Sequence, residues 1–436
     1  MKNNLKYIFA LLLLLAPCSL PLAFAQTAGT LSPYSRFGLG LLHDQSQGFN
    51  KSMGGAGLGV RMGNRINVSN PASYAVIDSL SLILDIGMTG TFGRMRQDEQ
   101  RAGVKGASLD YAHVGMHIAK NLGLAFGFMP YTDIGYDFSP QEEVISYNPD
   151  NMLPIKGTSA YTGTGGLNQA YIGLGWKVFR RFSIGANVSF LWGKYDHTLM
   201  QIFTEGSSSS SSTAFDVIIK NNYASFRTYK IDLGVQYPVR LTKQDWLNFG
   251  ATASLGHKIP QDATVTNGER IDTVPSPFDL PYTFGVGLAW QHKNTLLVAT
   301  DVHHEFWSNC RMPIETLDSY VPMKGYYKNR TKIAVGAQYT PNPFGKYWER
   351  IQYRAGMNFA TPHLIVNGVN GPYEFCMSVG AGVPITNRIN NRSFVNVGLQ
   401  WLRRSASSAG MITENYFLIN LGVTFNERWF MKYKIN

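Results

Sequence analysis

The sequence predicts an all-β protein: a transmembrane antiparallel β-barrel of about 14 strands, with the N-terminal segment inside its lumen. Two observations lead to this prediction. Segments of strand length alternate large apolar residues with glycine or another small residue, and the links between them include both tight turns and long polar stretches. Both patterns are typical of barrels that cross a membrane with tilted strands.

The chain begins with a segment typical of a secretory signal peptide. Lys2 and Lys6 accompany an apolar run, and Ala23 and Ala25 occupy the small-residue positions of a signal-peptidase site. We therefore expect residues 1–25 to be removed. A lipoprotein anchor at Cys18 is the weaker alternative, because the preceding residue is a proline. No later stretch of the sequence has the roughly 20 uninterrupted apolar residues that a transmembrane helix needs.

The mature chain is basic and poor in cysteine. Loss of Lys2 and Lys6 leaves 37 Lys and Arg residues against 28 Asp and Glu residues, a net charge of +9. In an exported protein this charge favours membrane lipid and lipopolysaccharide phosphates over nucleic acid as partners. Only Cys310 and Cys376 remain, so no disulfide framework is expected, and the sequence leaves open whether these two pair. We expect the chain in the outer membrane of a Gram-negative bacterium.

Residues 26–79, which we call the hatch, are expected to fold into the lumen. Their glycine loop does not fit a dinucleotide-binding loop, because Val60 stands where a third glycine is required and Pro71 would break the following helix. We interpret the glycines as allowing an irregular backbone to pass close to a barrel wall, with Asn70-Pro71 turning the chain into the first strand.

Residues 80–436 are expected to form the barrel. In "YTFGVGLAW", Phe284, Val286, Leu288 and Trp290 alternate with Gly285, Gly287 and Ala289, and similar alternation recurs along the chain. The predicted strands lie near residues 80–94, 107–119, 122–134, 168–179, 182–200, 224–238, 245–258, 281–292, 294–308, 330–340, 350–361, 373–384, 392–404 and 413–426.

The small residues indicate which face points inward. A face in contact with water would carry mainly polar residues, whereas glycine and alanine suit a lumen crowded by a plug. The large apolar face then meets lipid, with Trp176 and Trp290 near the membrane interfaces. This assignment predicts that Leu288→Arg hinders assembly and that Gly287→Ser is tolerated.

The lengths of the links between strands predict which end of the barrel faces the periplasm. Lys120-Asn121, Arg180-Arg181 and His292-Lys293 are tight turns, whereas residues 135–166 and the serine run from Ser207 to Ser212 fall in long polar links. Short turns mark the periplasmic side of such barrels and long loops the outside.

Several motifs together resemble the FadL/TodX family of outer-membrane transport proteins for hydrophobic compounds. They are "SPYSRFGLG" from Ser32, "MGGAGLG", "SNPAS" around Asn70, and in the carboxy half "VATDVHHEFWSN", "KIAVGAQYTP" and "LGVTFNERWF". The resemblance implies a fourteen-stranded barrel, an inward-folded hatch and a kink in the third strand that opens the wall sideways.

The resemblance leaves two functions open. The first is uptake of a hydrophobic small molecule, of the long-chain fatty acid or aromatic type, through hatch and lateral gate. The alternative is a non-transporting barrel, similar to PorV-like members, that serves as a partner subunit of an outer-membrane secretion or assembly complex. A lateral gate is expected at Gly127 and Pro130, because proline cannot donate to the strand ladder. It stays open whether Pro130 breaks the pairing or merely ends the strand.

Candidate ligand residues in the hatch come from the same motifs. Arg36 is the best candidate for an anionic head group, because its guanidinium can pair with a carboxylate. Each of these residues also fits a purely plugging role. The candidate hatch residues are Tyr34, Arg36, Phe37, Gly38, Gly40, Gly55, Gly57, Asn70, Pro71 and Ala72.

No catalytic or metal site is predicted. Asp301, His303 and Glu305 share one face of a strand, and we interpret them as polar residues that satisfy one another in the lumen. No serine context suggests a nucleophile, so we expect no enzyme activity and no cofactor.

Overall fold

The computed structural model describes residues 32–139, 143–147, 154–179, 181–205, 213–315, 320–366, 368–385, 393–408 and 410–428. Fourteen antiparallel strands form the wall: β2 (Ser81–Gln97), β3 (Gln100–Ala119), β4 (Leu122–Phe138), β6 (Pro154–Lys177), β7 (Ser183–Glu205), β8 (Thr213–Arg240), β9 (Asp245–Ser254), β14 (Thr283–His292), β15 (Leu296–Glu305), β18 (Arg330–Tyr339), β19 (Gln352–Ala360), β22 (Tyr373–Ile385), β23 (Ser393–Ser405) and β24 (Thr413–Arg428). The signal peptide, the hatch before Ser32, Arg180 and the serine run lie outside the described residues.

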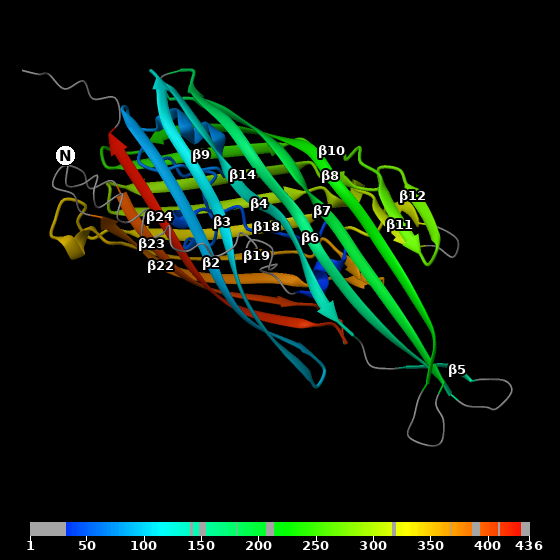
Figure 1. Cartoon of the computed structure of the whole chain (residues 1–436). Helices are drawn as coiled ribbons and strands as arrows, with labels where there is room; N and C mark the ends of the chain where they lie inside the picture. Colours follow the sequence, from blue (N-terminus) through cyan, green and yellow to red (C-terminus); the bar gives the residue numbers. More distant parts are fainter. Residues whose placement is uncertain are drawn as a thin grey trace, which may run out of the picture.

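The first and last strands close the wall. β2 pairs with β24 over sixteen residue pairs, including Ile86 with Val423, and each remaining wall strand pairs with its neighbour in chain order. In Figure 1 the red β24 runs beside the blue β2. The predicted fourteen-stranded antiparallel barrel is confirmed.

The large apolar residues face outward. Phe284, Val286, Leu288 and Trp290 of β14 are exposed, whereas the intervening Gly285, Gly287 and Ala289 are buried. Exposed aromatic residues on the outward rows also gather where the strands meet their shortest turns: Trp176, Tyr237, Trp290, Tyr339 and Tyr353. Such a girdle marks a membrane interface.

The two ends of the barrel differ. The turns β3–β4, β6–β7, β8–β9 and β14–β15 are short and lie at the end where β2 begins and β24 finishes. We call this the short-turn end, which corresponds to the periplasmic side of outer-membrane barrels. We call the opposite end the long-loop end.

Three strands continue past the predicted limits at the long-loop end, β6 and β8 by more than ten residues and β7 by five. β6, β7 and β8 have 24, 23 and 28 residues, and the hairpin β11 (Ala263–Asn267) and β12 (Arg270–Val274) adds to the edge of β8. Residues 135–166, expected as a long link, instead contain the end of β4, the short β5 (Glu143–Tyr147) and the first part of β6. Figure 1 shows this extension running toward β5, away from the rest of the wall.

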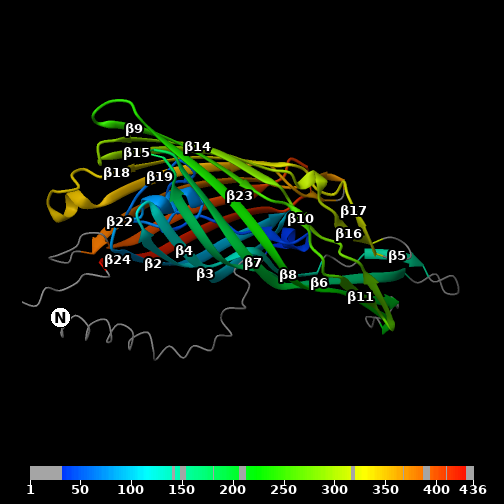
Figure 2. The same ribbon diagram turned by 90° about the horizontal axis from the view of Figure 1, so that it is seen from above.

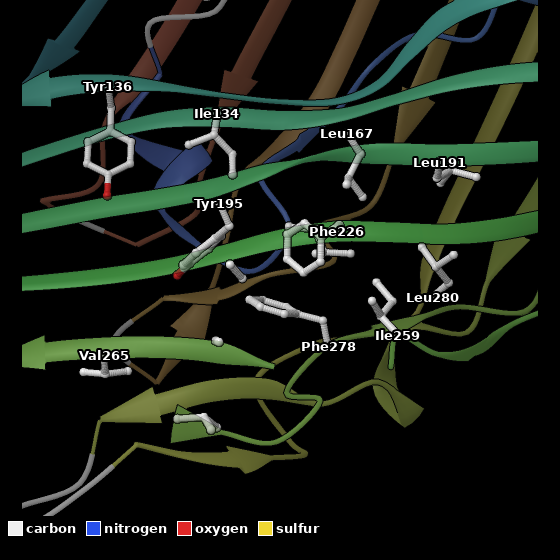
Figure 3. Packing of buried hydrophobic residues seen from close by; sticks show 14 residues of the cluster. Ile134, Tyr136, Leu167, Leu191, Tyr195, Phe226, Ile259, Val265, Phe278 and Leu280 are labelled. Atoms are coloured by element: carbon white, nitrogen blue, oxygen red, sulfur yellow. The ribbon is translucent and has the colours of Figure 1, made fainter. Parts of the chain in front are cut away.

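Loops cover the mouth at the long-loop end. The β9–β14 loop, with β10 (His257–Lys258) and β13 (Asp279–Leu280), packs Ile259 and Phe278 against Leu167 and Phe226 of the extended strands. Figure 3 shows these side chains converging between the loop and the strands. A second loop carries η4 (Trp307–Asn309), β16 (Met312–Glu315) and β17 (Tyr320–Met323), and a third carries β20 (Ile365–Val366) and β21 (Val369–Asn370). In Figure 2, β11, β16 and β17 lie at the same end of the barrel as β5.

The described part of the hatch contains only short elements: η2 (Pro33–Arg36), β1 (Leu41–Leu42), α2 (Gly48–Lys51) and η3 (Pro71–Val76). A further short helix, η5 (Tyr347–Arg350), lies in the β18–β19 link. None of the helices in the described part of the chain is long and apolar enough to cross a membrane.

Small inward residues leave room for the hatch. A Cβ atom at Gly175 would lie 2.6 Å from the Pro71 carbonyl oxygen and 2.7 Å from the Ala75 amide nitrogen. At Gly287 it would overlap the Asp301 carboxylate and lie 2.7 Å from the Leu58 Cβ atom. The expectation that Gly287→Ser is tolerated is therefore wrong, because at this position the lumen is filled by the hatch rather than by water.

Candidate functional site

Asp301 on β15 holds the glycine loop of the hatch. Its Oδ2 atom accepts hydrogen bonds from the backbone amides of Gly57 at 2.6 Å and Leu58 at 2.8 Å. Neighbouring inward residues add to this contact, since Gln236 of β8 donates to the Leu58 carbonyl at 3.0 Å. Side chains of two wall strands, β15 and β8, thus bond to backbone groups of the loop. These backbone groups are free to bond because the loop is not in a helix or a strand.

Asn70 and Pro71 form a second attachment. Asn70 caps η3 by accepting from the Ala72 amide at 3.1 Å, and its Nδ2 group donates to the carbonyls of Leu58 at 2.9 Å and Val235 at 3.1 Å. Pro71 and Ala72 pack against Gly185 on the inner face of β7. The Asn-Pro-Ala segment therefore joins the glycine loop, the wall and η3.

A cavity of about 320 Å³ lies between the hatch and the inner wall. Its lining is dominated by charged and polar side chains contributed by both. The ionisable ones are His43, Asp44, Lys51, Asp110, Tyr131, Asp133, Lys230, Asp232, His303, Glu305, Arg330, Lys332, Glu374, Cys376, Arg404 and Tyr416. Such a lining differs from the mainly apolar pockets that hold hydrophobic small molecules.

One side of the cavity is a row of alternating charges. Arg330 contacts Glu305 at 2.9 Å and Glu374 at 2.7 Å, and Arg404 contacts Glu374 at 2.8 Å and Glu414 at 3.3 Å. Each acid lies against an arginine, as burial of charge demands. The row links five wall strands, β15, β18, β22, β23 and β24, across the inner face of the wall.

The other side of the cavity joins the hatch to β3 and β4. Lys51 contacts Asp110 at 2.6 Å, and His43 lies 3.6 Å from Asp110 and 2.9 Å from Asp133. Burial lowers the pKa of His43, but its contacts with the carboxylates of Asp110 and Asp133 outweigh that effect and raise it to about 9. His43 is therefore a cation at neutral pH and bridges two strands.

The predicted ligand residues of the hatch lie mostly outside this cavity. Tyr34 is buried and donates to the Ile412 carbonyl at 2.6 Å, and Phe37 packs in the same cluster. The Arg36 guanidinium stacks over the Tyr161 ring, 3.9 Å from its centroid. Gly38 and Gly40 have φ angles of +62° and +91°, values that favour glycine. Of the ten candidates, Gly55 alone lines the cavity.

The polar triplet of β15 divides between two roles. His303 and Glu305 line the cavity, whereas Asp301 binds the glycine loop. Glu305 also accepts from the Trp307 indole at 2.6 Å. Within the described ranges, no group of three His, Cys, Asp or Glu side chains is arranged to hold a metal ion. Cys310 and Cys376 are both buried and free.

The wall is interrupted between β3 and β4. Their pairing ends at Ala112 with Phe128, although β4 continues through Pro130 to Phe138 and both strands are fully described. Past this point β1 of the hatch pairs with β4, placing Leu41 opposite Asp133, and the His43 amide donates to the Tyr131 carbonyl at 3.0 Å. The β4–β6 ladder shifts register after Pro130 as well. Gly127 and Pro130 thus flank the site where the hatch replaces β3 as the neighbour of β4.

The sequence interpretation missed the residues that carry most of the lumen charge. These are His43, Lys51, Asp110, Asp133, Arg330, Glu374, Arg404 and Glu414. The available signal was a charged residue on the small-residue face of a strand, such as Asp110 in β3 and Arg404 in β23. Which of them meet depends on the register of strands far apart in sequence.

A closed wall of fourteen strands around an N-terminal plug defines the class of FadL-type outer-membrane barrels. A Pseudomonas aeruginosa FadL homologue has a TM-score of 0.58 with 12% identity, over 87% of this chain and 98% of that one. The Pseudomonas putida toluene transporter TodX has a TM-score of 0.57 with 15% identity, over 89% and 100% of the two chains. The monoaromatic hydrocarbon channel CymD has a TM-score of 0.54 with 12% identity, over 91% and 100%. At these identities the likeness establishes the fold alone.

The chain belongs to the BamG family, which it matches over residues 5–436. Neither this family nor the FadL-type channels are enzymes. A search among curated proteins finds no match.

Proposed function

We propose that this protein is a partner subunit of an outer-membrane assembly complex rather than a channel for hydrophobic compounds. The observation that carries the proposal is the extension of β6, β7 and β8, where exposed apolar residues of β8 and β12 lie on the outward face among polar ones such as Asn221 and Asp196. Val217, Ile219 and Tyr223 of β8 and Ile271 of β12 are exposed on this face. Their opposite face is covered by the β9–β14 loop (Figure 3).

Lipid cannot cover this apolar strip. Ile219 precedes Tyr237 of the aromatic girdle by 18 residues along β8. At about 3.3 Å per residue and a tilt of about 45°, that separation is roughly 40 Å along the membrane normal. The apolar band of such barrels is only about 25 Å tall. Exposed apolar surface outside the bilayer favours contact with another protein.

The cavity chemistry supports the same proposal. A hydrophobic ligand would have to displace or bypass the charged row from Glu305 to Glu414, although Leu41, Leu42 and Leu402 also line the cavity. Membership of the BamG family also supports it, because the name associates the family with the BAM machinery that assembles outer-membrane barrels. In this role the hatch serves as a fixed plug, and the signal peptide, residues 1–25, directs export of the chain.

The test is recovery of a partner under gentle detergent. Tagged protein is solubilised from its native membrane, and the expected result is a co-purifying protein in fixed stoichiometry. Ile219→Asp should reduce recovery at least several-fold. Ser225→Asp is the matched control, because Ser225 is exposed on the same face of β8 without contributing apolar area. Equal recovery with both variants, or no partner at all, would contradict the proposal.

The interrupted wall favours a second candidate, lateral passage of a hydrophobic molecule past Gly127 and Pro130. In that reading β1 is the movable element, because it occupies the edge of β4 that β3 leaves free. Co-purified apolar ligand in the lumen, identified by mass spectrometry after denaturation, would support this candidate. Lateral passage also predicts that a cross-link between β1 and β4 abolishes uptake of the hydrophobic molecule.

A further inference from the structure

A second, larger cavity opens at the short-turn end. It is a crevice of about 810 Å³ between the hatch and four turns of the wall. The hatch contributes Arg61, Gly63 and Val76. The wall contributes Lys177, Arg181, Pro238, Lys243, Gln244, Trp246, Asn248, Gln291, Lys293, Asn294, Thr295, Asn342, Pro343 and Phe344. The crevice is separate from the charged lumen cavity and shares no lining residue with it.

The charge of the crevice is entirely of one sign. Arg61, Lys177, Arg181, Lys243 and Lys293 line it, and its described lining contains no Asp or Glu. This contrasts with the lumen cavity, where each arginine of the charged row contacts an acid. Because five cations converge without acidic neighbours in the lining, the crevice attracts an anionic ligand.

One residue of the crevice also has an unsatisfied donor. The Nη1 atom of Arg61 is buried and has no hydrogen-bond partner within the described residues. Burial lowers the pKa of Arg61 to about 10, so its guanidinium stays charged at neutral pH. A buried donor of this kind costs free energy unless it is satisfied. A carboxylate supplied from outside would satisfy it.

The rim of the crevice carries apolar side chains beside the cations. Phe344 is 88% exposed, and Trp246, which also lines the crevice, is exposed as well. A ligand with both anionic and apolar groups suits this combination. Large exposed aromatic side chains next to cations are common where proteins bind other proteins.

We propose that the crevice binds an acidic, extended segment of a partner protein in the periplasm. This inference rests on the proposed function, since it names the chemistry of one contact of the partner subunit. A protein segment suits the position better than a lipid headgroup. Arg61 belongs to the hatch, which lies within the ring of strands, whereas lipid headgroups surround the outside of the wall.

The direct test uses a fluorescein-labelled hexaglutamate peptide and the mature full-length protein in detergent micelles, followed by fluorescence anisotropy. The peptide should bind, and the affinity should fall steeply with salt. The double variant K243Q/K293Q should weaken binding about three- to tenfold. Both lysines lie in exposed turns, so folding is expected to be unchanged.

The matched control is K120Q/K346Q, which removes two exposed cations at the same end that do not line the crevice. Affinity equal to that of the unchanged protein supports the proposal. Equal weakening by both double variants would overturn it, because the effect would then be one of net charge. Absence of peptide binding would overturn it too.

A lipid ligand would give a different pattern. If crevice variants weaken binding to vesicles containing 30% phosphatidylglycerol while peptide binding is unaffected, a headgroup site replaces the proposed peptide site. The proposed function is tested separately, by recovery of a partner and its loss with Ile219→Asp. A partner that still co-purifies with K243Q/K293Q at undiminished affinity overturns this inference and leaves the proposed function standing.

Discussion

Asp301 of the wall binds Gly57 of the glycine loop, with the Gly57 amide 2.6 Å from the Asp301 Oδ2 atom. The same oxygen accepts from Leu58, so one carboxylate satisfies two buried amides of an otherwise irregular backbone. The hatch is thereby attached to the middle of the wall as well as to its ends.

Asp301→Ala is expected to loosen the hatch. Two buried amides would lose their acceptor, at about 1–3 kcal/mol each. Trypsin should then cleave the hatch faster at Arg61 and Arg65, as measured by mass spectrometry of the fragments. Asp301→Asn keeps an acceptor oxygen and serves as the control. A cleavage rate unchanged in Asp301→Ala would show that the glycine loop does not depend on this bond.

Gly175→Ala is expected to reduce the yield of folded barrel in the membrane. Its Cβ atom would lie within 2.7 Å of two backbone atoms of η3, which side chains cannot relieve by moving. Gly103→Ala on β3 is the control, because nothing lies within 4 Å of its added Cβ atom. Heat-modifiable gel mobility of both variants gives the folded fraction, and equal fractions would argue against a hatch packed tightly on the wall.

Val286→Arg is expected to hinder membrane assembly. Val286 is 60% exposed, in the lipid-facing row of β14 and close to the middle of the strand. An arginine near the bilayer midplane costs about 2–4 kcal/mol, falling to about 0–1 kcal/mol near the interface. Leu241→Arg at the short-turn end is the interfacial control. The assignment of faces fails if outer-membrane yields of the two variants are the same.

The attachment of the hatch to β4 should weaken in alkaline solution. Because the pKa of His43 is raised from 6.5 to about 9, its contribution to stability is complete below about pH 6.5 and is lost as the pH rises through about 9. Hydrogen exchange of the His43 amide, which donates to Tyr131, should accelerate over this range beyond the intrinsic rise. His43→Gln should remove the extra pH dependence, and its persistence in that variant would assign it to another group.

Full-length protein should conduct ions poorly in planar bilayers, and deletion of residues 29–49 should raise the conductance. The deletion removes β1 and His43 but keeps Asn70-Pro71-Ala72 and every wall strand. It therefore opens a path beside β4 without breaking the wall's own ladder. Equal conductance of the two forms would mean that this segment does not block the lumen.

The barrel could be predicted because large apolar and small residues alternate within each strand, as from Phe284 to Trp290 of β14. This pattern can be recognised without knowing which strands are neighbours. The ends of the long strands could not. Gly163, Gly165 and Gly166 read as loop, yet they lie within β6, where Gly163 makes room for the Tyr136 ring and the others for carbonyls of neighbouring strands. A close approach between strands and a turn both require glycine, so the residue type alone does not separate them.

The pairing of charged residues in the lumen could not be predicted, for a different reason. Arg330 meets Glu374, 44 residues away, and Glu414 meets Ser32, 382 residues away. Such pairs depend on the register of several ladders at once and on the path of the hatch. The hatch motifs around Gly57 and Asn70 were found, but their partners Asp301 and Val235 follow only from the closed barrel.

The pairing of β2 with β24 also constrains the order in which the molecule folds. Ile86 and Val423 are neighbours in the ladder but more than 300 residues apart in the chain, so the wall closes only after the last strand has arrived. The hatch precedes every wall strand and bonds to residues on opposite arcs of the lumen, including Asp110, Asp301 and Gln400. Threading it afterwards through a finished ring would require these bonds to form in a confined space. We expect instead that the strands close around a hatch already in position, so that the seam between β2 and β24 is the last to form.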